Sequence, residues 1–362
     1  MMSINEMIIY VLAFFLVIGA LDHILGNKFG LGERFRDGFV AMGPLALVIV
    51  GIVSLAPVIA NFLVPIVSPL YVFIGADPAT FANTILALDM GGYALAEEMA
   101  KSEDAGLFAW VFLGTMLGPT IAFSIPVALG MIEKQDYQFF AKGILIGLCT
   151  IPIGSFIGGI VAGFDWSMMA RNLVIPVLIS LFIMAGLLFF MKHMIKLFHY
   201  FGTAIKVVAI IGLVAISFET LTGFVMIPGL APLEAGIQTV GLIAIVLAGA
   251  FPFVAVLTKV LAKPLKGMGA IIHLNDKSTA GLIASLAHII PMLVLLKEMD
   301  ERGKVVNIAF AVSGAFVFGG HLGFVASVNQ EMVMAMIIGK LTAGVCAVLL
   351  ALLFTRNRNV LT

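Results

Sequence analysis

The segment MIIYVLAFFLVIGALDHIL, residues 7–25, is apolar along its length and carries no charge before Asp22. A helix of this size is about 30 Å long, which matches the hydrocarbon core of a bilayer. The first residues carry no basic charge, so we predict a retained span and not a cleaved signal peptide. Comparable continuous runs predict further helices at about 38–63, 105–132, 138–163, 171–191, 203–225, 236–262, 304–327 and 330–355.

The composition of the chain also points to a membrane. Hydrophobic residues make up 62% of the 362 residues and charged residues only 11%, against about 25% charge in soluble domains. A soluble fold of this size cannot hide so much apolar surface. The formal net charge is zero, which gives no electrostatic reason to expect a nucleic acid partner. We predict a multi-pass protein of the cytoplasmic (inner) membrane, in contact with lipid.

The sequence contains no catalytic or metal-binding motif that we recognise. His-Glu-x-x-His, Gly-x-Ser-x-Gly and the Walker phosphate loop are all missing. Cys149 and Cys346 lie far apart in apolar runs, without the spacing of metal ligands. We therefore predict that the protein is not an enzyme and binds no cofactor or metal. An intramembrane enzyme or a sensory subunit is the alternative from another class.

Two regions, 64–100 and 264–299, differ from the continuous runs. In each, a short run with proline is followed by polar residues and then by a second apolar run. A 12-residue helix is about 18 Å long and cannot cross the hydrocarbon core alone. Each region is predicted to form a re-entrant helical hairpin or a span of two broken helices.

The two halves of the chain share residues in the same order. Asp22 and Gly26 correspond to Glu219 and Gly223, at an offset of 197. Chance identity among common apolar residues is the alternative, but it explains several ordered blocks poorly. The longest block recurs 200 residues later and consists of Leu86, Ala87, Leu95, Glu98, Met99, Ala109 and Gly114.

The positions of Lys and Arg orient these repeats. With the N-terminus outside, and each hairpin region starting and ending on one face, most of them, including Arg356 and Arg358, fall inside. We predict an all-α polytopic membrane protein of about 11–13 membrane helices in two inverted repeats, each with a hairpin of broken helices. The repeats are 1–168 and 201–362, with a connecting helix in 169–200 and the C-terminus inside. Inverted repeats are typical of secondary transporters.

Isolated acids in apolar runs are the first candidates for a substrate site. A charge at the bilayer centre costs roughly 2.5–3.5 kcal/mol, and Asp22, Asp89 and Glu219 are each set among apolar residues. We predict that they hold a cation in a central cavity. The alternatives are that Asp22 lies at a helix end near the interface and that Asp89, before Gly91 and Gly92, caps a helix break.

The polar residues of the two hairpin regions are further candidates. If the hairpins reach the middle of the membrane, these side chains line the substrate path; if not, they are ordinary loop residues. His288 and His321 are single histidines on apolar runs, more typical of packed histidines than of ligands. The predicted hairpin ligands are Asn83, Thr84, Asn275, Asp276 and Thr279.

The chain as a whole resembles the ethanolamine-utilisation transporter family of bacterial permeases. The resemblance is carried by LALDMGGYALAEEM (86–99), LGPT (117–120), HLNDKSTAGLIASLAH (273–288) and FGGHLGF (318–324). It implies transport of ethanolamine, a primary amine that is protonated at neutral pH. Such a substrate needs a carboxylate for its ammonium group and a polar partner for its hydroxyl. Another small cationic or amino compound, with or without proton coupling, is the alternative, and a homo-oligomer is left open.

Overall fold

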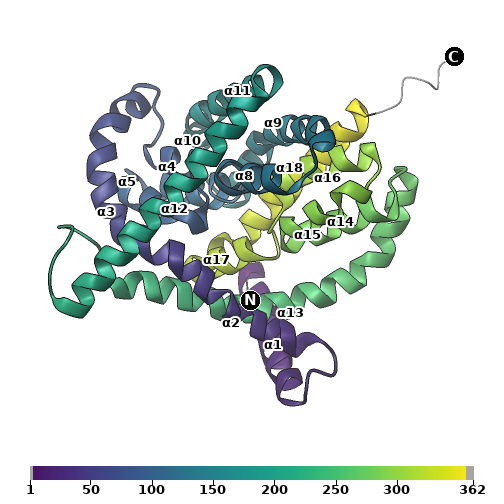
Figure 1. The fold of residues 1–362 in the computed structure, drawn as a ribbon, viewed down its shortest axis with the longest axis horizontal. Helices are drawn as coiled ribbons and strands as arrows, with labels where there is room; N and C mark the ends of the chain where they lie inside the picture. The colour runs from purple at the N-terminus through teal and green to yellow at the C-terminus, as the bar shows by residue number, and fades with distance from the viewer. Residues whose placement is uncertain (1–2, 356–362) are drawn as a thin grey trace.

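The computed structural model describes residues 3–355, except for the side chains of six residues between 261 and 270. Every regular element in this range is a helix, as Figure 1 shows, so the all-α prediction is confirmed. Arg356, Arg358 and the C-terminus lie outside the described residues. Among the described residues, seven helices are long and apolar enough to cross a membrane, or eight if one bent pair counts as a span.

The predicted 11–13 membrane helices exceed this number because several elements are too short to span the bilayer. The long helices are α1 (Ile4–Ile24), α3 (Met42–Phe73), α9 (Tyr137–Val161), α11 (Val174–Phe189), α12 (Met191–Thr222), α13 (Leu233–Ile271) and α18 (Val333–Phe354). Four of them (α1, α9, α11 and α18) begin and end within a few residues of a predicted apolar run, whereas α3, α12 and α13 each extend about ten residues beyond the predicted run at one end. Two shorter helices, α2 (Leu31–Val40) and α10 (Trp166–Asn172), precede α3 and α11.

The remaining helices form two hairpins and two interrupted helices. The hairpins are α4 (Ala79–Ile85) with α5 (Gly92–Met99), and α14 (Asp276–Ala287) with α15 (Ile289–Leu295). The first interrupted helix consists of α6 (Glu103–Phe108), η2 (Ala109–Leu113), α7 (Leu117–Pro119), η3 (Thr120–Ser124) and α8 (Ile125–Met131), and the second of α16 (Glu301–Gly314) and α17 (Gly320–Val328). The single turns are η1 (Leu88–Met90), η4 (Lys134–Asp136), η5 (Leu296–Glu298) and η6 (Gln330–Met332).

The same order of elements occurs twice along the chain. Long helices lead to a hairpin, then to an interrupted helix and a closing long helix, first in α1–α9 and again in α12–α18. In Figure 1, α3 and the first hairpin lie on the left, the second hairpin lies on the right, and α13 runs across the lower part of the view toward it. Helices α9, α16 and α18 pack against one another between them.

The hairpins are shorter than the predicted regions because proline does not end the preceding helices. Pro65 and Pro69 lie inside α3, and Pro264 lies inside α13. Within a membrane, neighbouring helices and local adjustments can satisfy the backbone groups that proline frees. The runs from Val64 and Pro264 therefore belong to long helices. The predicted spans 105–132 and 304–327 are instead interrupted near Gly114 and Phe316, and the first bends by 43°.

At the end away from its central break, each hairpin is held by hydrogen bonds to an aspartate. Asp77 accepts the backbone N–H of Lys101 at 3.0 Å. Asp300 accepts the backbone N–H of Asn275 at 3.0 Å and the hydroxyl of Ser278 at 2.7 Å. Burial raises the pKa of Asp300, but the hydrogen bonds outweigh this effect and hold the pKa below its usual value. The start of each hairpin is thus tied to the start of the next interrupted helix.

A buried ion pair joins the two halves of the protein. Lys304 of α16 contacts Asp136 of η4, and their side chains are 10% and 1% exposed. Removing one partner of such a pair leaves the other charge buried without compensation. The closing turn before α9 is therefore fixed electrostatically to the second interrupted helix.

We expect Asp136→Asn to lower the stability of the protein by about 3 kcal/mol or more, because Lys304 loses its counter-charge. Thermal unfolding in detergent measures this, with the exposed neighbour Glu133→Gln as the matched control. The double variant Asp136→Leu with Lys304→Met should recover part of the loss. Equal melting temperatures for Asp136→Asn and Glu133→Gln would contradict the assignment.

Candidate functional site

A cavity of about 870 Å³ opens between the two halves of the protein. Charged side chains of α2 and α13 stand at its mouth, and Arg34 pairs with Asp37 there at 3.3 Å. The wall is apolar and comes largely from α13. Further lining residues come from α3 and from the broken helices, the latter including Asp89, Ala287, His288, Phe316 and Phe324.

Asp89 is held at the cavity by the break between α4 and α5. Gly91 has a φ of 92°, and a Cβ at this position would collide with Ile52. Only glycine fits this turn without strain. The N–H of Leu88 donates to the carbonyl of Gly114 at 2.9 Å, which ties the turn to the break in the next helix. The Gly-Gly pair therefore positions the carboxylate.

Asp89 lacks a cationic partner among the described residues, and its carboxylate receives a hydrogen bond from its own backbone N–H. Among the described side chains, Asp89 makes no ion pair and no hydrogen bond to another side chain. Its side chain is half-buried because it faces the cavity. A carboxylate in such surroundings is costly unless a cation compensates it. The cavity therefore contains an anionic point that a small cation can satisfy.

His288 adds a polar group at the break between α14 and α15. Its Nδ1 accepts the N–H of Ile290 at 3.1 Å. In the neutral imidazole, the hydrogen then lies on Nε2, which is left to donate to a ligand. The ring packs edge-on against Phe316, with centroids 4.8 Å apart.

Two helices end at this part of the cavity. Helix α14 ends at Ala287 and α16 ends at Gly314, close to the lining residue Phe316. The N–H of Phe316 donates to the carbonyl of Ser285 at 3.0 Å, which holds the two ends together. The C-terminus of a helix carries a partial negative charge, and aromatic faces attract cations. Both features favour a cation beside Asp89.

Asn83 and Thr84 are buried on α4 and do not line this cavity. The amide of Asn83 packs against Gly92 and Gly114, where a Cβ would collide with it. Neither polar atom of this amide has a hydrogen-bond partner among the described residues. The Thr84 hydroxyl donates to a carbonyl of its own helix at 2.6 Å. Their predicted part in substrate binding stays a prediction.

Asp22 lies away from the cavity and caps α2. Its carboxylate accepts the N–H groups of Phe29, Leu31 and Gly32 at 2.8–2.9 Å. These donors are free at the start of a helix and favour an anion. The geometry matches the helix-end alternative and leaves the carboxylate compensated.

Glu219 occupies the corresponding place in the last turn of α12. It is half-buried and does not line the cavity. One of its carboxylate oxygens has no hydrogen-bond partner among the described residues.

The three candidates of the second hairpin lie at the first turn of α14. Asn275 caps the helix by accepting the N–H of Ser278 at 2.7 Å, and Thr279 donates to the Asn275 carbonyl at 3.3 Å. Asp276 is exposed. Twelve helical residues, about 18 Å, separate this turn from His288. Of the eight predicted ligands, Asp89 alone lines the large cavity.

Sequence reasoning undervalued the residues that surround Asp89. His288 was interpreted as a packed histidine, and the aromatic residues Phe316 and Phe324 were not considered. The Gly-Gly pair after Phe318 could have indicated a helix break near these residues, because a Gly-Gly pair also follows Asp89 at the break between α4 and α5. Only the structure shows that the breaks meet.

These features define the class of the protein. It is a multi-pass membrane protein in which interrupted helices surround a cavity with an uncompensated carboxylate, the organisation typical of membrane transporters. Residues 4–354 match the family described as "Ethanolamine utilisation protein, EutH". The chain therefore belongs to the EutH family.

The similar proteins are bacterial and of about the same length. The chain is 63% identical to protein YxeR of Bacillus subtilis (strain 168), over 96% of this chain and 94% of the relative. It is 56% identical to the "Probable ethanolamine permease EutH" of Listeria monocytogenes, over 96% and 93%. The protein of that name from Escherichia coli (strain K12) is 41% identical, over 99% and 97%. No solved structure matches the chain.

The comparisons confirm two predictions from the sequence. Permeases are transport proteins, so the prediction that the chain is not an enzyme is confirmed. The multi-pass location in the cytoplasmic membrane is confirmed as well.

We expect Asp22→Ala to act on stability and not on substrate affinity. The loss of three N–H partners from the start of α2 should destabilise the protein by about 1–3 kcal/mol. Thermal unfolding measures the change in stability. The KM for substrate uptake, determined with equal amounts of folded protein, measures the change in affinity. A KM raised tenfold, with unchanged unfolding, would contradict the capping role.

Proposed function

We propose that the protein transports ethanolamine across the cytoplasmic membrane by alternating access, with Asp89 as the group that binds the ammonium ion. Family membership and the printed names of the relatives support the substrate. The single observation that carries the site is the Asp89 carboxylate, which faces the cavity without a cation of its own.

The cavity suits both ends of an amino alcohol. The ammonium group binds Asp89, while the ring faces of Phe316 and Phe324 and the end of α14 add further attraction. The hydroxyl oxygen accepts the Nε2–H of His288. Because the wall is otherwise apolar, a cation that is not neutralised by the carboxylate is excluded.

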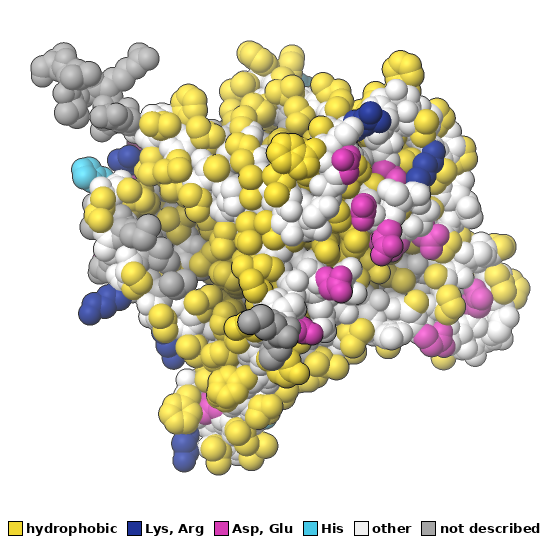
Figure 2. Space-filling model, turned by 180° about the vertical axis from the view of Figure 1, so that it is seen from behind, with side chains coloured by type: hydrophobic (Ala, Val, Ile, Leu, Met, Phe, Trp, Pro, Cys, Tyr) yellow, Lys and Arg dark blue, Asp and Glu magenta, His cyan; other side chains and the backbone are white. Residues whose placement is uncertain are grey.

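The proposed topology places the cavity mouth on the cytoplasmic side, with the N-terminus outside. On the face drawn in Figure 2, most Lys and Arg gather toward the left edge and most Asp and Glu toward the right. This asymmetry, and Arg34 and Lys259 at the mouth, support a cytoplasmic opening. The repeated order of elements supports two inverted repeats that move against each other around the broken helices.

Another small amine is the second candidate, because Asp89 and the aromatic rings recognise the ammonium group alone. His288 is the feature that favours a hydroxylated amine. Proton coupling and a homo-oligomer stay open predictions.

We expect Asp89→Asn to reduce kcat/KM for uptake of labelled ethanolamine by about 30-fold or more, because a buried cation loses its counter-charge. Glu33→Gln at the cavity mouth is the matched control and should stay within a few-fold of the natural protein. Purified protein in proteoliposomes provides the measurement. Normal uptake by Asp89→Asn would refute the site.

We expect His288→Leu to weaken the preference for ethanolamine over ethylamine by up to about tenfold, the upper value of one net hydrogen bond. Competition of each amine with labelled ethanolamine measures the preference. The affinity for ethylamine itself should change little. If the preference survives in the variant, the hydroxyl binds elsewhere.

A further inference from the structure

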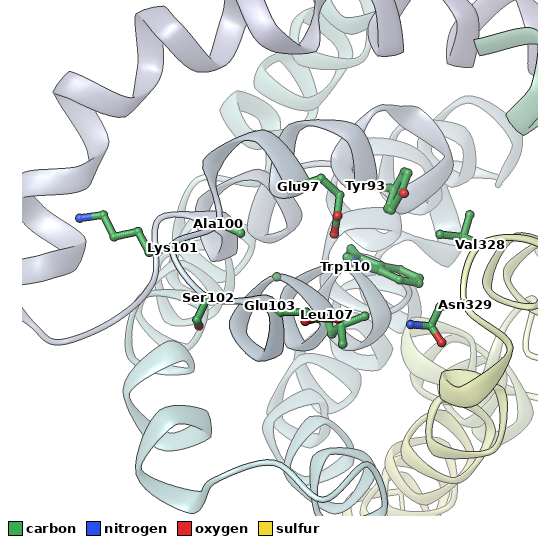
Figure 3. A pocket seen from close by; sticks show the side chains of 11 residues that line it. Tyr93, Glu97, Ala100, Lys101, Ser102, Glu103, Leu107, Trp110, Val328 and Asn329 are labelled. Carbon is green, nitrogen blue, oxygen red and sulfur yellow. The ribbon is translucent and has the colours of Figure 1, made fainter. Parts of the chain in front are cut away.

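A second pocket, of about 340 Å³, lies beyond the far end of the central cavity. Its lining residues come from α5, the start of α6, η2 and the end of α17. Figure 3 shows Glu97 directed toward Tyr93 and Trp110, with Asn329 on the opposite side. The proposed site at Asp89 does not use this pocket.

Two segments of the chain contribute residues both to the cavity that Asp89 lines and to this pocket. In each segment these residues are four positions apart. Along the first, Asp89 lines the cavity, and Tyr93 and Glu97 line the pocket. Along α17, Gly320 and Phe324 line the cavity, and Val328 lines the pocket. Along the continuous helix α17, four residues rise about 6 Å. The two spaces therefore lie one after the other along α17.

A layer of aromatic side chains separates the two spaces. Tyr93 packs edge-on against Phe324, with ring centroids 5.5 Å apart, and against Trp110 at 5.2 Å. Phe324 faces the cavity, whereas Tyr93 and Trp110 face the pocket. The packed rings of Phe324, Tyr93 and Trp110 thus connect the lining of the cavity with that of the pocket.

The chemistry of the pocket suits a small organic cation. Glu97 and Glu103 contribute two carboxylates, and the Lys101 side chain points away from them (Figure 3). Trp110 is 1% exposed, and its indole N–H faces Glu97 without completing a hydrogen bond of good geometry. A carboxylate beside two aromatic faces is a common way to bind an ammonium group.

We propose that this pocket is a second binding site for a small primary ammonium ion, on the side of the membrane opposite the cavity mouth. Glu97 binds the ammonium group, and the rings of Tyr93 and Trp110 contact its carbon atoms. The indole N–H of Trp110 faces the Glu97 carboxylate and helps to orient it. The aromatic layer is the closed barrier between this site and Asp89. The inference rests on the proposed transport of an amine, but it concerns a separate site.

The two tryptophans of the chain make the site directly observable. Trp166 is exposed on α10, so Trp166→Phe leaves Trp110 as the only tryptophan. Adding Asp89→Asn removes binding at the central cavity. In this background, methylammonium and ethanolamine should change the Trp110 emission in a saturable way.

Glu97→Gln should weaken this binding by about fivefold or more, the value of one partly solvated charge contact. Glu98→Gln is the matched control, because Glu98 is an exposed neighbour that does not line the pocket. In the otherwise natural protein, Glu97→Gln should also raise the KM for uptake from the pocket side and leave the KM from the cavity side unchanged.

Equal titrations and equal KM values for Glu97→Gln and Glu98→Gln would overturn the second site. An emission that does not change with either amine, together with those equal KM values, would overturn it as well. Both results are distinct from failure of the proposed function, which would appear as no uptake of ethanolamine by the natural protein, and from failure of the Asp89 site, which would appear as normal uptake by Asp89→Asn.

Discussion

The account depends on one electrostatic constraint, a carboxylate kept in an apolar interior without a cation of its own. Several other buried charges among the described residues have polar or charged partners. Asp136 pairs with Lys304, Asp22 accepts three backbone N–H groups, and Lys340 donates to the carbonyl of Thr115 at 2.6 Å. Asp89 differs because its carboxylate faces a cavity and not a compensating group. A cation that enters the cavity removes the energetic cost of that charge.

The broken helices explain how the fold holds such a group. A continuous helix satisfies its own backbone hydrogen bonds and presents only side chains to its surroundings. A break in a helix also directs the free backbone groups of the helix ends toward the interior. Gly91 permits the turn that carries Asp89, and His288 stands at the matching break of the second hairpin. The backbone of each break is bonded to the break in the following helix, through Leu88 with Gly114 and Phe316 with Ser285. The site is therefore rigid at its backbone and open only toward the cavity.

The sequence predicted the parts of this architecture that depend on local composition. Long apolar runs identified the membrane helices, and the isolation of Asp89 among apolar residues marked it as a candidate. The hairpin limits were misplaced because Pro65 and Pro264 stay within helices when neighbours satisfy the backbone. The function proposed for His288 could not be predicted from the sequence, because it depends on segments about 200 residues apart that line one cavity. Asp22 shows the converse, since an isolated acid can be compensated by a loop that folds back onto it.

The occupancy of the cavity by ethanolamine can be measured directly by protection of a cysteine. Ala284 lines the cavity one turn before His288, and Cys149 and Cys346 can be replaced by alanine to give a thiol-free background. Lys277→Cys, at the exposed start of the same helix, is the control. Ethanolamine should slow maleimide labelling of Ala284→Cys and leave the control unchanged, and Asp89→Asn should abolish the protection. Labelling of Ala284→Cys that ethanolamine does not alter, at concentrations that saturate uptake, would contradict the account.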